Sequence, residues 1–424
     1  MKIWDLEKEH DKLLSSILEG REKKKKNIKT VVEAVKHEIL ARGETALIEF
    51  SKKWDGWKQD YNLKVSEEEL TESASKVKKK DRDILRGMMK NVLLYHKSQG
   101  GRPRTYTRKG LNIKETFVPV ESTMVYVPGG KAAYPSSLIM GVVPAKVAGV
   151  NRICVATPTA DGMLNPYVAA ACVLLDIKEV YRIGGAQAVY AFAYGVGCIP
   201  KVDMIVGPGN AYVDEAKRDV YGMVGIDMLA GPTELVVLCT YKFSPDIIAW
   251  DMFSQGEHDE MATVGLFSPS KEHIYDVMKS IERLIITNER KDVIEKALRE
   301  NSFLVYYEDI EKAVKTINSI APEHMELIGD EGVSEKVLYP GIVYLGAHTP
   351  VAMGDYYIGT NHVLPTGGAG RFTAGLSVDR FTKRKVVVKI DEQFLNKYGD
   401  KAVKMARIEG LYAHGESIKA RKGL

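Results

Sequence analysis

The sequence predicts an α/β fold with two Rossmann-like parallel-sheet domains, a helical N-terminal segment and a C-terminal tail. Apolar strand patterns alternate with helix patterns from about residue 116 onward, as expected for βαβ units with right-handed crossovers. Glycine-bearing turns follow several of these strands. At 424 residues the chain is also too long for one ordinary hydrophobic core, so we expect at least two domains.

Composition is typical of a soluble globular enzyme. Hydrophobic residues make up 45% of the chain and charged residues 27%, which excludes a disordered or fibrous protein. The net charge is only +4, and the basic runs at 23–26 and 78–80 lie in predicted helices with acidic neighbours, so we expect solvated faces and no nucleic-acid partner. The N-terminus has no apolar leader, and no apolar run is long enough to span a bilayer. We therefore expect a cytoplasmic protein without a membrane partner.

The first part of the chain is predicted to be helical and is followed by the first α/β unit. Apolar positions such as Val31, Val35 and Ile39 have helical spacing, and this pattern continues to about residue 100. Strands are then predicted at 124–127, 152–156, 180–183 and 204–206, with helices at 136–147 and 165–175. We assign 126–233 to a Rossmann-like nucleotide-binding domain.

A second α/β unit begins at the apolar run 235–238. It continues with helix 245–258, strand 263–267, helix 271–284, strand 303–306, helix 308–319 and strand 341–345. We predict a catalytic and metal-binding domain made of 22–125 and 234–376, preceded by an N-terminal helical arm at 1–21. The charged stretch that follows, with a helix at 391–408, is predicted to form a C-terminal tail at 377–424.

The cysteines do not have the spacing of a metal site. Cys154, Cys172, Cys198 and Cys239 form no CxxC pair, and three of them lie in apolar runs. We expect small buried hydrophobic residues in a reducing compartment, in preference to metal ligands or a nucleophile.

Histidines with acidic or amide neighbours recur in segments that are far apart in the sequence. Gln255 and His258 are three residues apart in the predicted helix 245–258, so they share one face. The other members are Asp355, His362, Glu409 and His414. Histidine nitrogen, carboxylate and amide oxygen suit Zn²⁺ or a similar ion. Each motif alone also fits a structural histidine, but together they indicate a metal site.

A candidate acid–base pair, Glu323 and His324, follows Ala321-Pro322. The proline predicts the start of a helix at this point. A general base must be able to lose its proton near neutral pH, which makes His324 the natural candidate, and Glu323 could take a proton from water in another step. The alternative is that Glu323 is an N-terminal helix charge that stabilises the helix dipole.

Three glycine turns follow predicted strands and precede predicted helices, at 129–130, 184–185 and 207–210. Such turns allow a phosphate or dinucleotide to approach a helix N-terminus. None of them is GxGxxG, so each one alone also fits a structural turn. Three turns at one edge of a sheet would line a crevice, which is the usual setting of a ligand site.

In order and spacing, these segments resemble the histidinol dehydrogenase family over roughly residues 20–420. The resemblance rests on eight separated blocks: 126–137 (YVPGGKAAYPSS), 184–188 (GGAQA), 206–213 (VGPGNAYV), 226–232 (IDMLAGP), 254–259 (SQGEHD), 321–324 (APEH), 354–365 (GDYYIGTNHVLP) and 409–414 (EGLYAH).

The resemblance implies an enzyme that oxidises L-histidinol to L-histidine in two hydride transfers to NAD, through a bound aldehyde. It implies one zinc ion per chain that binds the substrate, and a homodimer in which the tail completes the partner's site. The implied acid–base pair is Glu323 and His324, and the implied nucleotide contacts are Tyr126, Gln187 and Asn210. The implied zinc ligands are Gln255, His258, Asp355 and His414. These ligands also count as substrate contacts, together with Thr233, His324, His362 and Glu409.

Two departures from the family pattern concern the substrate pocket. Thr233 stands where the family usually has a serine, and Glu260, Met261 and Thr263 replace the residues that commonly follow 258–259. A related NAD-dependent dehydrogenase for another small amino or hydroxy alcohol is therefore an alternative.

A zinc hydrolase would leave the glycine turns unexplained. A non-catalytic metal-binding protein would leave 323–324 without a role.

Overall fold

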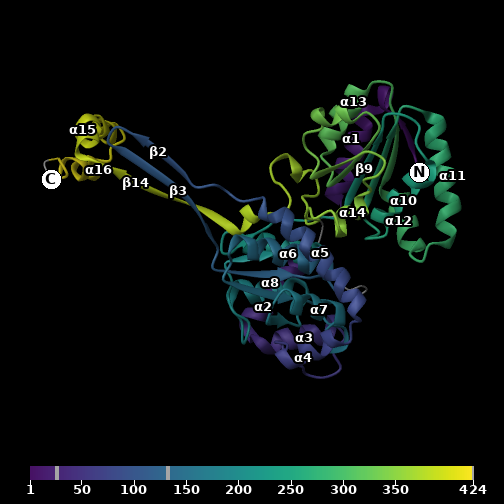
Figure 1. The fold of residues 1–424 in the computed structure, drawn as a ribbon, viewed down its shortest axis with the longest axis horizontal. Helices are drawn as coiled ribbons and strands as arrows, with labels where there is room; N and C mark the ends of the chain where they lie inside the picture. Colours follow the sequence, from purple (N-terminus) through teal and green to yellow (C-terminus); the bar gives the residue numbers. More distant parts are fainter. Residues whose placement is uncertain (24–27, 130–133, 423–424) are drawn as a thin grey trace.

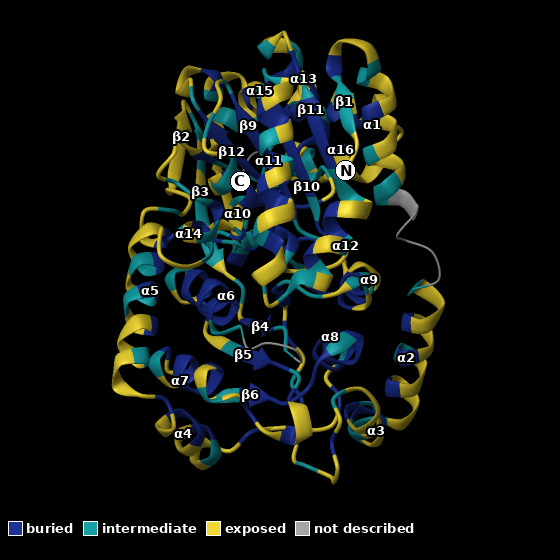
Figure 2. Ribbon diagram, turned by 90° about the vertical axis from the view of Figure 1, so that its right-hand side faces the viewer, coloured by how far each residue is buried: buried dark blue, intermediate teal, exposed yellow. Residues whose placement is uncertain are grey.

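The structure, a computed structural model, describes residues 1–23, 28–129 and 134–422. Most of the basic run 23–26 and part of the block 126–137 lie outside the described residues. The chain forms two α/β lobes and a long arm that projects away from both lobes (Figure 1). Buried residues are concentrated in the sheets and on the inner faces of the surrounding helices (Figure 2). The predicted fold class is confirmed.

One lobe, called the smaller lobe because its parallel sheet has fewer strands, is built on a five-stranded sheet with the order β6-β5-β4-β7-β8. Its strands are β4 (Ser122–Tyr126), β5 (Arg152–Ala156), β6 (Glu179–Tyr181), β7 (Met204–Val206) and β8 (Gly225–Ile226). The connecting helices are α6 (Pro135–Ala148), α7 (Pro166–Leu174), α8 (Gly185–Tyr194) and α9 (Ala211–Val220). The chain runs outward from β4 to β6 and then returns to β7 on the other side of β4. A doubly wound sheet places its ligand crevice at such a switch point, here between β4 and β7.

Four helices from the first hundred residues pack on this smaller lobe. They are α2 (Ile28–Arg42), α3 (Glu44–Trp54), α4 (Glu67–Ser75) and α5 (Lys79–Lys97). Ile39 of α2 joins the same buried cluster as Ile205 of β7, and Val92 of α5 joins that of Val125 of β4. We predicted that residues 22–125 belong to the catalytic and metal-binding domain, together with 234–376. The packing instead joins these four helices to the smaller lobe.

The larger lobe is built on a six-stranded parallel sheet with the order β1-β11-β10-β9-β12-β13. Its strands are β1 (Ile3–Asp5), β9 (Glu234–Cys239), β10 (Thr263–Ser268), β11 (Ser302–Tyr306), β12 (His324–Ile328) and β13 (Ile342–Leu345). Its helices are α1 (Leu6–Lys23), α10 (Pro245–Gly256), α11 (Lys271–Leu284), α12 (Lys291–Asn301), α13 (Ile310–Ile320) and α14 (Val351–Tyr356). Every residue of β9 is buried, which explains its continuous apolar run. Residues 3–5 form an edge strand of this sheet, so the N-terminal segment is part of the lobe.

The arm is an antiparallel sheet that ends in two helices. Strand β14 (Thr382–Ile390) pairs along its whole length with β3 (Leu111–Pro119), and β3 pairs with β2 (Arg104–Arg108). Helices α15 (Glu392–Ile408) and α16 (Tyr412–Lys419) follow at the far end (Figure 1). The predicted tail is therefore anchored to the hairpin β2–β3 from the first third of the chain, which the sequence pattern did not indicate.

Two predictions from composition can be compared with the structure. Cys154, Cys172 and Cys239 are buried, Cys198 is exposed, and all four are free thiols. Among the helices of the described ranges, none combines the length and the apolar character that crossing a bilayer requires.

Candidate active site

The candidate site lies where the chain crosses from the smaller to the larger lobe. Strand β8 ends at Ile226 in one sheet, and β9 begins at Glu234 in the other. A contact between the lobes lies close by, because Ser137 Oγ in the first turn of α6 is 3.3 Å from His362 Nε2. The carboxyl ends of β4 and β7 and the amino ends of β9 and β12 contribute the predicted site residues.

The Glu323 carboxylate is buried and held by two donors. Its Oε2 atom accepts hydrogen bonds from Thr233 Oγ1 at 2.6 Å and from the backbone nitrogen of Glu234 at 3.0 Å. A carboxylate that accepts such bonds is fixed in orientation. Both donors belong to the start of β9, so the sheet itself places this side chain.

His324 is the first residue of β12 and only 3% exposed. Its Nδ1 atom lies 3.2 Å from the carbonyl oxygen of Glu234 and 3.4 Å from Glu323 Oε2, whereas Nε2 has no partner in the described structure. Donation from Nδ1 to that carbonyl leaves Nε2 as the basic atom of the neutral ring. Burial opposes protonation, but the carboxylates of Glu323 and Asp355 outweigh it and raise the pKa of His324 to about 9.

The predicted helix start at Pro322 is wrong. Helix α13 ends at Ile320, and Ala321 follows in the left-handed conformation with φ 46°. His324 then begins β12, which is paired on one side with β9 and on the other with β13. A proline after a left-handed residue is common beyond a helix C-terminus as well as at the start of a helix. The alternative role of Glu323 as a helix N-terminal charge is excluded with it.

The residue that organises this pair was not found from the sequence. Glu234 contacts Glu323 through its backbone nitrogen and His324 through its carbonyl oxygen. Its own buried carboxylate receives two bonds from Arg21 of α1, Nε to Oε1 at 2.9 Å and Nη2 to Oε2 at 2.9 Å. A bidentate arginine–carboxylate pair fixes geometry as well as charge. No local motif marks either residue, because they are 213 positions apart.

Gln255 is placed beside the same network. It lies in the last turn of α10, is 1% exposed, and its Oε1 is 2.9 Å from Thr233 Oγ1. The Thr233 hydroxyl has a single proton to donate. It donates this proton to the Glu323 carboxylate, 2.6 Å away, because a charged acceptor is the stronger partner. The amide oxygen of Gln255 therefore remains able to coordinate a cation, and its Nε2 has no partner in the described structure.

His258 lies just beyond α10, and not within it as predicted. The helix ends at Gly256, and the backbone nitrogen of His258 bonds to the carbonyl oxygen of Gln255 at 3.2 Å in the turn that follows. His258 is exposed. The C-terminal end of a helix carries partial negative charge, so this turn is electrostatically suited to a cation.

Asp355 and His362 come from α14 and the segment after it. His362 Nδ1 is 3.0 Å from the carbonyl oxygen of Asp355 and 3.9 Å from its Oδ1. Burial lowers the pKa of His362, Asp355 opposes this effect, and the nearby His258 and His324 lower the pKa further. Helix α14 is fixed by its first N–H, from Val351 to Glu326 Oε1 of β12 at 2.7 Å.

Glu409 and His414 are not brought to this place within one chain. Both are exposed, on the turn after α15 and on α16, and these helices lie at the far end of the arm (Figure 1). In residues 1–23, 28–129 and 134–422, no three His, Cys, Asp or Glu side chains are grouped so that they could hold a metal ion.

Gly129 and the turns 184–185 and 207–210 lie at the carboxyl edge of the smaller sheet, as predicted, while Gly130 lies outside the described residues. A Cβ atom on Gly129 would lie 2.8 Å from the carbonyl oxygen of Pro158, and one on Gly184 would lie 2.5 Å from Pro158 Cβ. Pro158, directly after β5 and Thr157, thus separates two of the turns. The third turn, 207–210, follows β7 beside β4.

The predicted nucleotide contacts belong to this edge. Tyr126 ends β4, and its buried hydroxyl accepts a bond from the backbone nitrogen of Gly185 at 3.0 Å. Gln187 is buried in the first turn of α8. Asn210 is exposed and caps α9, with Oδ1 accepting from the backbone nitrogens of Tyr212 and Val213 at 3.1 and 3.2 Å.

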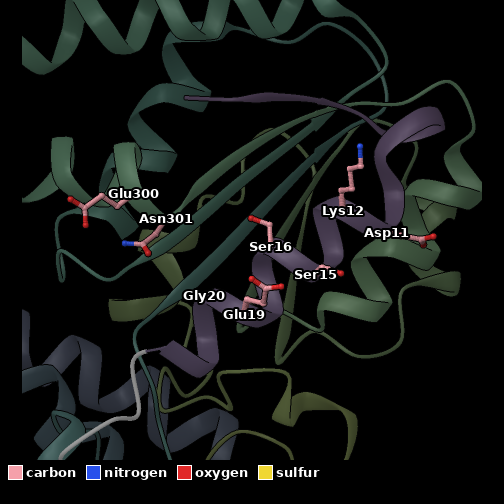
Figure 3. A pocket seen from close by; sticks show the side chains of 8 residues that line it. All are labelled: Asp11, Lys12, Ser15, Ser16, Glu19, Gly20, Glu300 and Asn301. Carbon is pink, nitrogen blue, oxygen red and sulfur yellow. The ribbon is translucent and has the colours of Figure 1, made fainter.

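A separate surface hollow involves none of these residues. It lies between α1 and the last two residues of α12, Glu300 and Asn301 (Figure 3). Charged side chains of both signs line it, including Asp11 and Lys12. Such a mixed, open surface has no convergent set of groups for one ligand.

A doubly wound sheet with glycine turns at its carboxyl edge, in a chain that also holds a buried carboxylate–imidazole pair, is typical of an α/β enzyme that moves protons beside a bound ligand. The family model "Histidinol dehydrogenase" matches residues 18–422. The chain belongs to the histidinol dehydrogenase family and is therefore an oxidoreductase.

Individual relatives agree with this assignment. A histidinol dehydrogenase of Nitrosospira multiformis is 41% identical over 418 residues, 97% of this chain and 95% of the relative. One from Geobacillus kaustophilus is 40% identical over 413 residues, 96% of each chain. The crystal structure of the Elizabethkingia anophelis histidinol dehydrogenase superposes with a TM-score of 0.88 at 32% identity, covering 93% of this chain and 92% of that one.

We expect the turnover rate to depend on His324 in the alkaline range. Because the pKa of His324 is raised to about 9, the ring is mostly protonated at neutral pH, and only its neutral form can accept a proton. The rate at saturating substrate should rise about tenfold per pH unit below about pH 9 and then level off. Glu323→Gln removes a carboxylate that raises this pKa, so its residual rate should level off at lower pH. A wild-type midpoint near the ordinary histidine value of about 6.5 would contradict the raised pKa of His324.

Proposed function

We propose that this protein oxidises L-histidinol to L-histidine, with NAD as hydride acceptor and zinc as the ion that holds the substrate. The observation that carries the proposal is the buried His324 ring, whose Nε2 has no partner while Nδ1 is fixed by a backbone carbonyl. This atom is the base that an alcohol oxidation needs, and it belongs to a chain of the histidinol dehydrogenase family.

The zinc ligands in this proposal are Gln255, His258, Asp355 and, from the partner's arm, His414. Amide oxygen, carboxylate and imidazole suit zinc. The amide oxygen of Gln255, which the Thr233 proton does not need as an acceptor, and the turn at the C-terminus of α10 both favour a cation. Zinc bound there would hold the imidazole and amine of the substrate and so orient its alcohol carbon.

The acid–base steps fall to two side chains. In the first oxidation, His324 Nε2 accepts the proton of the substrate hydroxyl group. Hydride leaves the carbon that carries this hydroxyl group for NAD, and the aldehyde is formed. Glu323 then takes a proton from water as the water oxygen adds to the aldehyde carbon, and the aldehyde oxygen takes back the proton held by His324. The resulting gem-diol gives a second hydride to a second NAD and a hydroxyl proton to His324 Nε2, and the acid is formed. The bonds from Thr233 and Glu234 keep the Glu323 carboxylate in place for this step.

Thr233 is compatible with histidinol as the substrate. Its hydroxyl makes the bond to Glu323 that a serine at this position could also make. The extra methyl group changes pocket volume without removing a polar group. Hydrophobic volume changes of this size alter selectivity modestly, whereas a lost hydrogen bond alters it strongly.

NAD is placed at the carboxyl edge of the smaller sheet, with contacts from Tyr126, Gln187 and Asn210. The N-termini of α8 and α9 meet there, and such ends favour the pyrophosphate of a dinucleotide. The turns pack closely enough that only glycine fits at 129 and 184.

The arm is proposed to cross to a second copy, giving a homodimer with shared sites that contain Glu409 and His414. Three valines of β14 support this, because Val386, Val387 and Val388 are 48%, 50% and 58% exposed although they form one aliphatic run. A second chain would cover such a surface. Closed two-fold symmetry is the commonest arrangement that lets each arm reach the other site.

For the base, we expect His324→Ala to lower kcat by about 10²-fold or more, the usual effect of losing a general base. His273→Ala is the matched control, since His273 is also buried in the larger lobe but contacts Ser268 and Phe243 away from the site. The measurement is NADH formation at saturating histidinol and NAD. A loss of only a few-fold for His324→Ala would remove it from the base role.

For the metal, we expect about one tightly bound zinc per chain, lost in His258→Ala and in His414→Ala and retained in His37→Ala, an exposed histidine of α2. Zinc affinity should fall at acid pH because imidazole ligands must be neutral. Elemental analysis of the purified chains measures this directly. Unchanged zinc in both site variants would identify the two histidines as structural.

For the arm, we expect complementation between two inactive chains. A His414→Ala chain and a His324→Ala chain should each be nearly inactive alone, whereas their co-expressed heterodimer regains one intact site. Its activity should reach up to about half that of the wild-type dimer. Heterodimers isolated with two affinity tags provide the measurement, and inactive heterodimers would mean that each chain uses its own arm.

A further inference from the structure

An ion pair in the smaller lobe is completely buried. Lys217 of α9 and Asp227, just after β8, form a salt bridge in which both side chains are 0% exposed. Lysine is almost never fully buried, and a buried ion pair adds little net stability compared with apolar residues of similar volume. A role in positioning neighbouring groups would explain the pair better than stability does.

The pair holds both polar backbone atoms of Gly207. Asp227 Oδ2 accepts a bond from the Gly207 nitrogen at 2.7 Å, and Lys217 Nζ donates to the Gly207 carbonyl oxygen at 3.1 Å. Asp227 Oδ1 also accepts from the backbone nitrogen of Met228 at 2.7 Å. Buried backbone groups need such partners, and here charged side chains supply them.

Gly207 is a position where the chain has little freedom. Its φ of 117° is a conformation that favours glycine, and a Cβ atom there would lie 2.1 Å from the Tyr126 carbonyl oxygen. Gly207 begins the turn 207–210 that ends at the cap Asn210. The pair therefore fixes the turn against Tyr126, so that two proposed nucleotide contacts keep their relative positions.

The same pair connects the turn to the crossing between lobes. Asp227 begins the segment 227–233, which ends at Thr233 beside Glu323. Asp214 also faces Lys217 from the first turns of α9, and burial raises its pKa to about 7 although Lys217 opposes this. Lys217 itself is bonded to Asp227 and to Gly207.

We infer that Lys217 and Asp227 are positioning residues for the nucleotide: the ion pair fixes the turn 207–210 in the shape that receives the dinucleotide phosphates and ties it to the segment that carries Thr233. The inference rests on the proposed function, because it presupposes NAD at this edge. Neither side chain touches the ligand, since both are enclosed.

The test is NADH binding to the full-length, zinc-loaded protein, followed by the fluorescence of NADH. The double variant Lys217→Met/Asp227→Leu removes both charges and both bonds to Gly207, and we expect its Kd for NADH to rise about tenfold or more. The KM for histidinol should change far less, a split that general loss of folded protein would not produce. Lys36→Met/Asp219→Leu is the matched control, because Lys36 of α2 and Asp219 of α9 form a 2.8 Å pair away from the turn, and its Kd should stay within about twofold of wild type.

Each outcome has one meaning. A Lys217→Met/Asp227→Leu protein that is folded by circular dichroism and binds NADH like wild type overturns the inference. If that variant does not fold, Asp227→Asn replaces it, since it keeps an acceptor for the Gly207 nitrogen and loses the charge that holds Lys217. An unchanged Kd in Asp227→Asn then overturns the inference, and a rise of about threefold supports it. Wild-type protein that binds no NADH contradicts the proposed function itself.

Discussion

The site depends on one residue, Glu234, at the start of a central strand. Its backbone nitrogen holds Glu323, its carbonyl oxygen holds His324, and its side chain is fixed by Arg21. Because β9 lies between β10 and β12, the peptide of Glu234 cannot move without disturbing the sheet. Breaking the Arg21 pair would leave a buried carboxylate without its cation, which is strongly destabilising. Helix α1, from the start of the chain, thereby supports the orientation of an acid–base pair some three hundred residues later.

The two sheets contribute opposite ends to one site. The smaller sheet follows the general rule for doubly wound folds, with its glycine turns at the carboxyl ends beside the switch point. The larger sheet presents the amino ends of β9 and β12 together with the C-terminus of α10. Backbone donors at a strand start suit carboxylates, and a helix C-terminus suits a cation. The larger lobe is therefore suited to the proposed metal binding and proton transfer. The helix N-termini of the smaller lobe are suited to the proposed phosphate contacts.

Sequence patterns predicted the buried elements well and the exposed ones poorly. Strands β5 and β7 were predicted to the residue because both lie within a covered parallel sheet. Strand β2 was missed because exposure of every residue removes the alternation on which such predictions depend. Strand β3, which is mostly half-buried, was missed as well. Pro322 misled the prediction at the acid–base pair, since proline follows helices as well as starting them. The pair itself was predicted from its chemistry, whereas Arg21 and Lys217 act through tertiary contacts that leave no local signal. Asp227 lay in the block 226–232, but its role was not predicted.

The arm connects metal binding with association of two chains. A three-stranded sheet exposed on both sides gains little from its own burial, and its valines are about half-exposed in the single chain. If His414 binds the zinc of the partner, as proposed, the ion is bound only by the dimer. Zinc binding and dimerisation are then linked equilibria. The factor by which zinc raises the affinity between the chains equals the factor by which dimerisation raises the affinity for zinc. Under this proposal, the arm that associates the two chains through its exposed strand also carries the residue that completes the coordination of the ion.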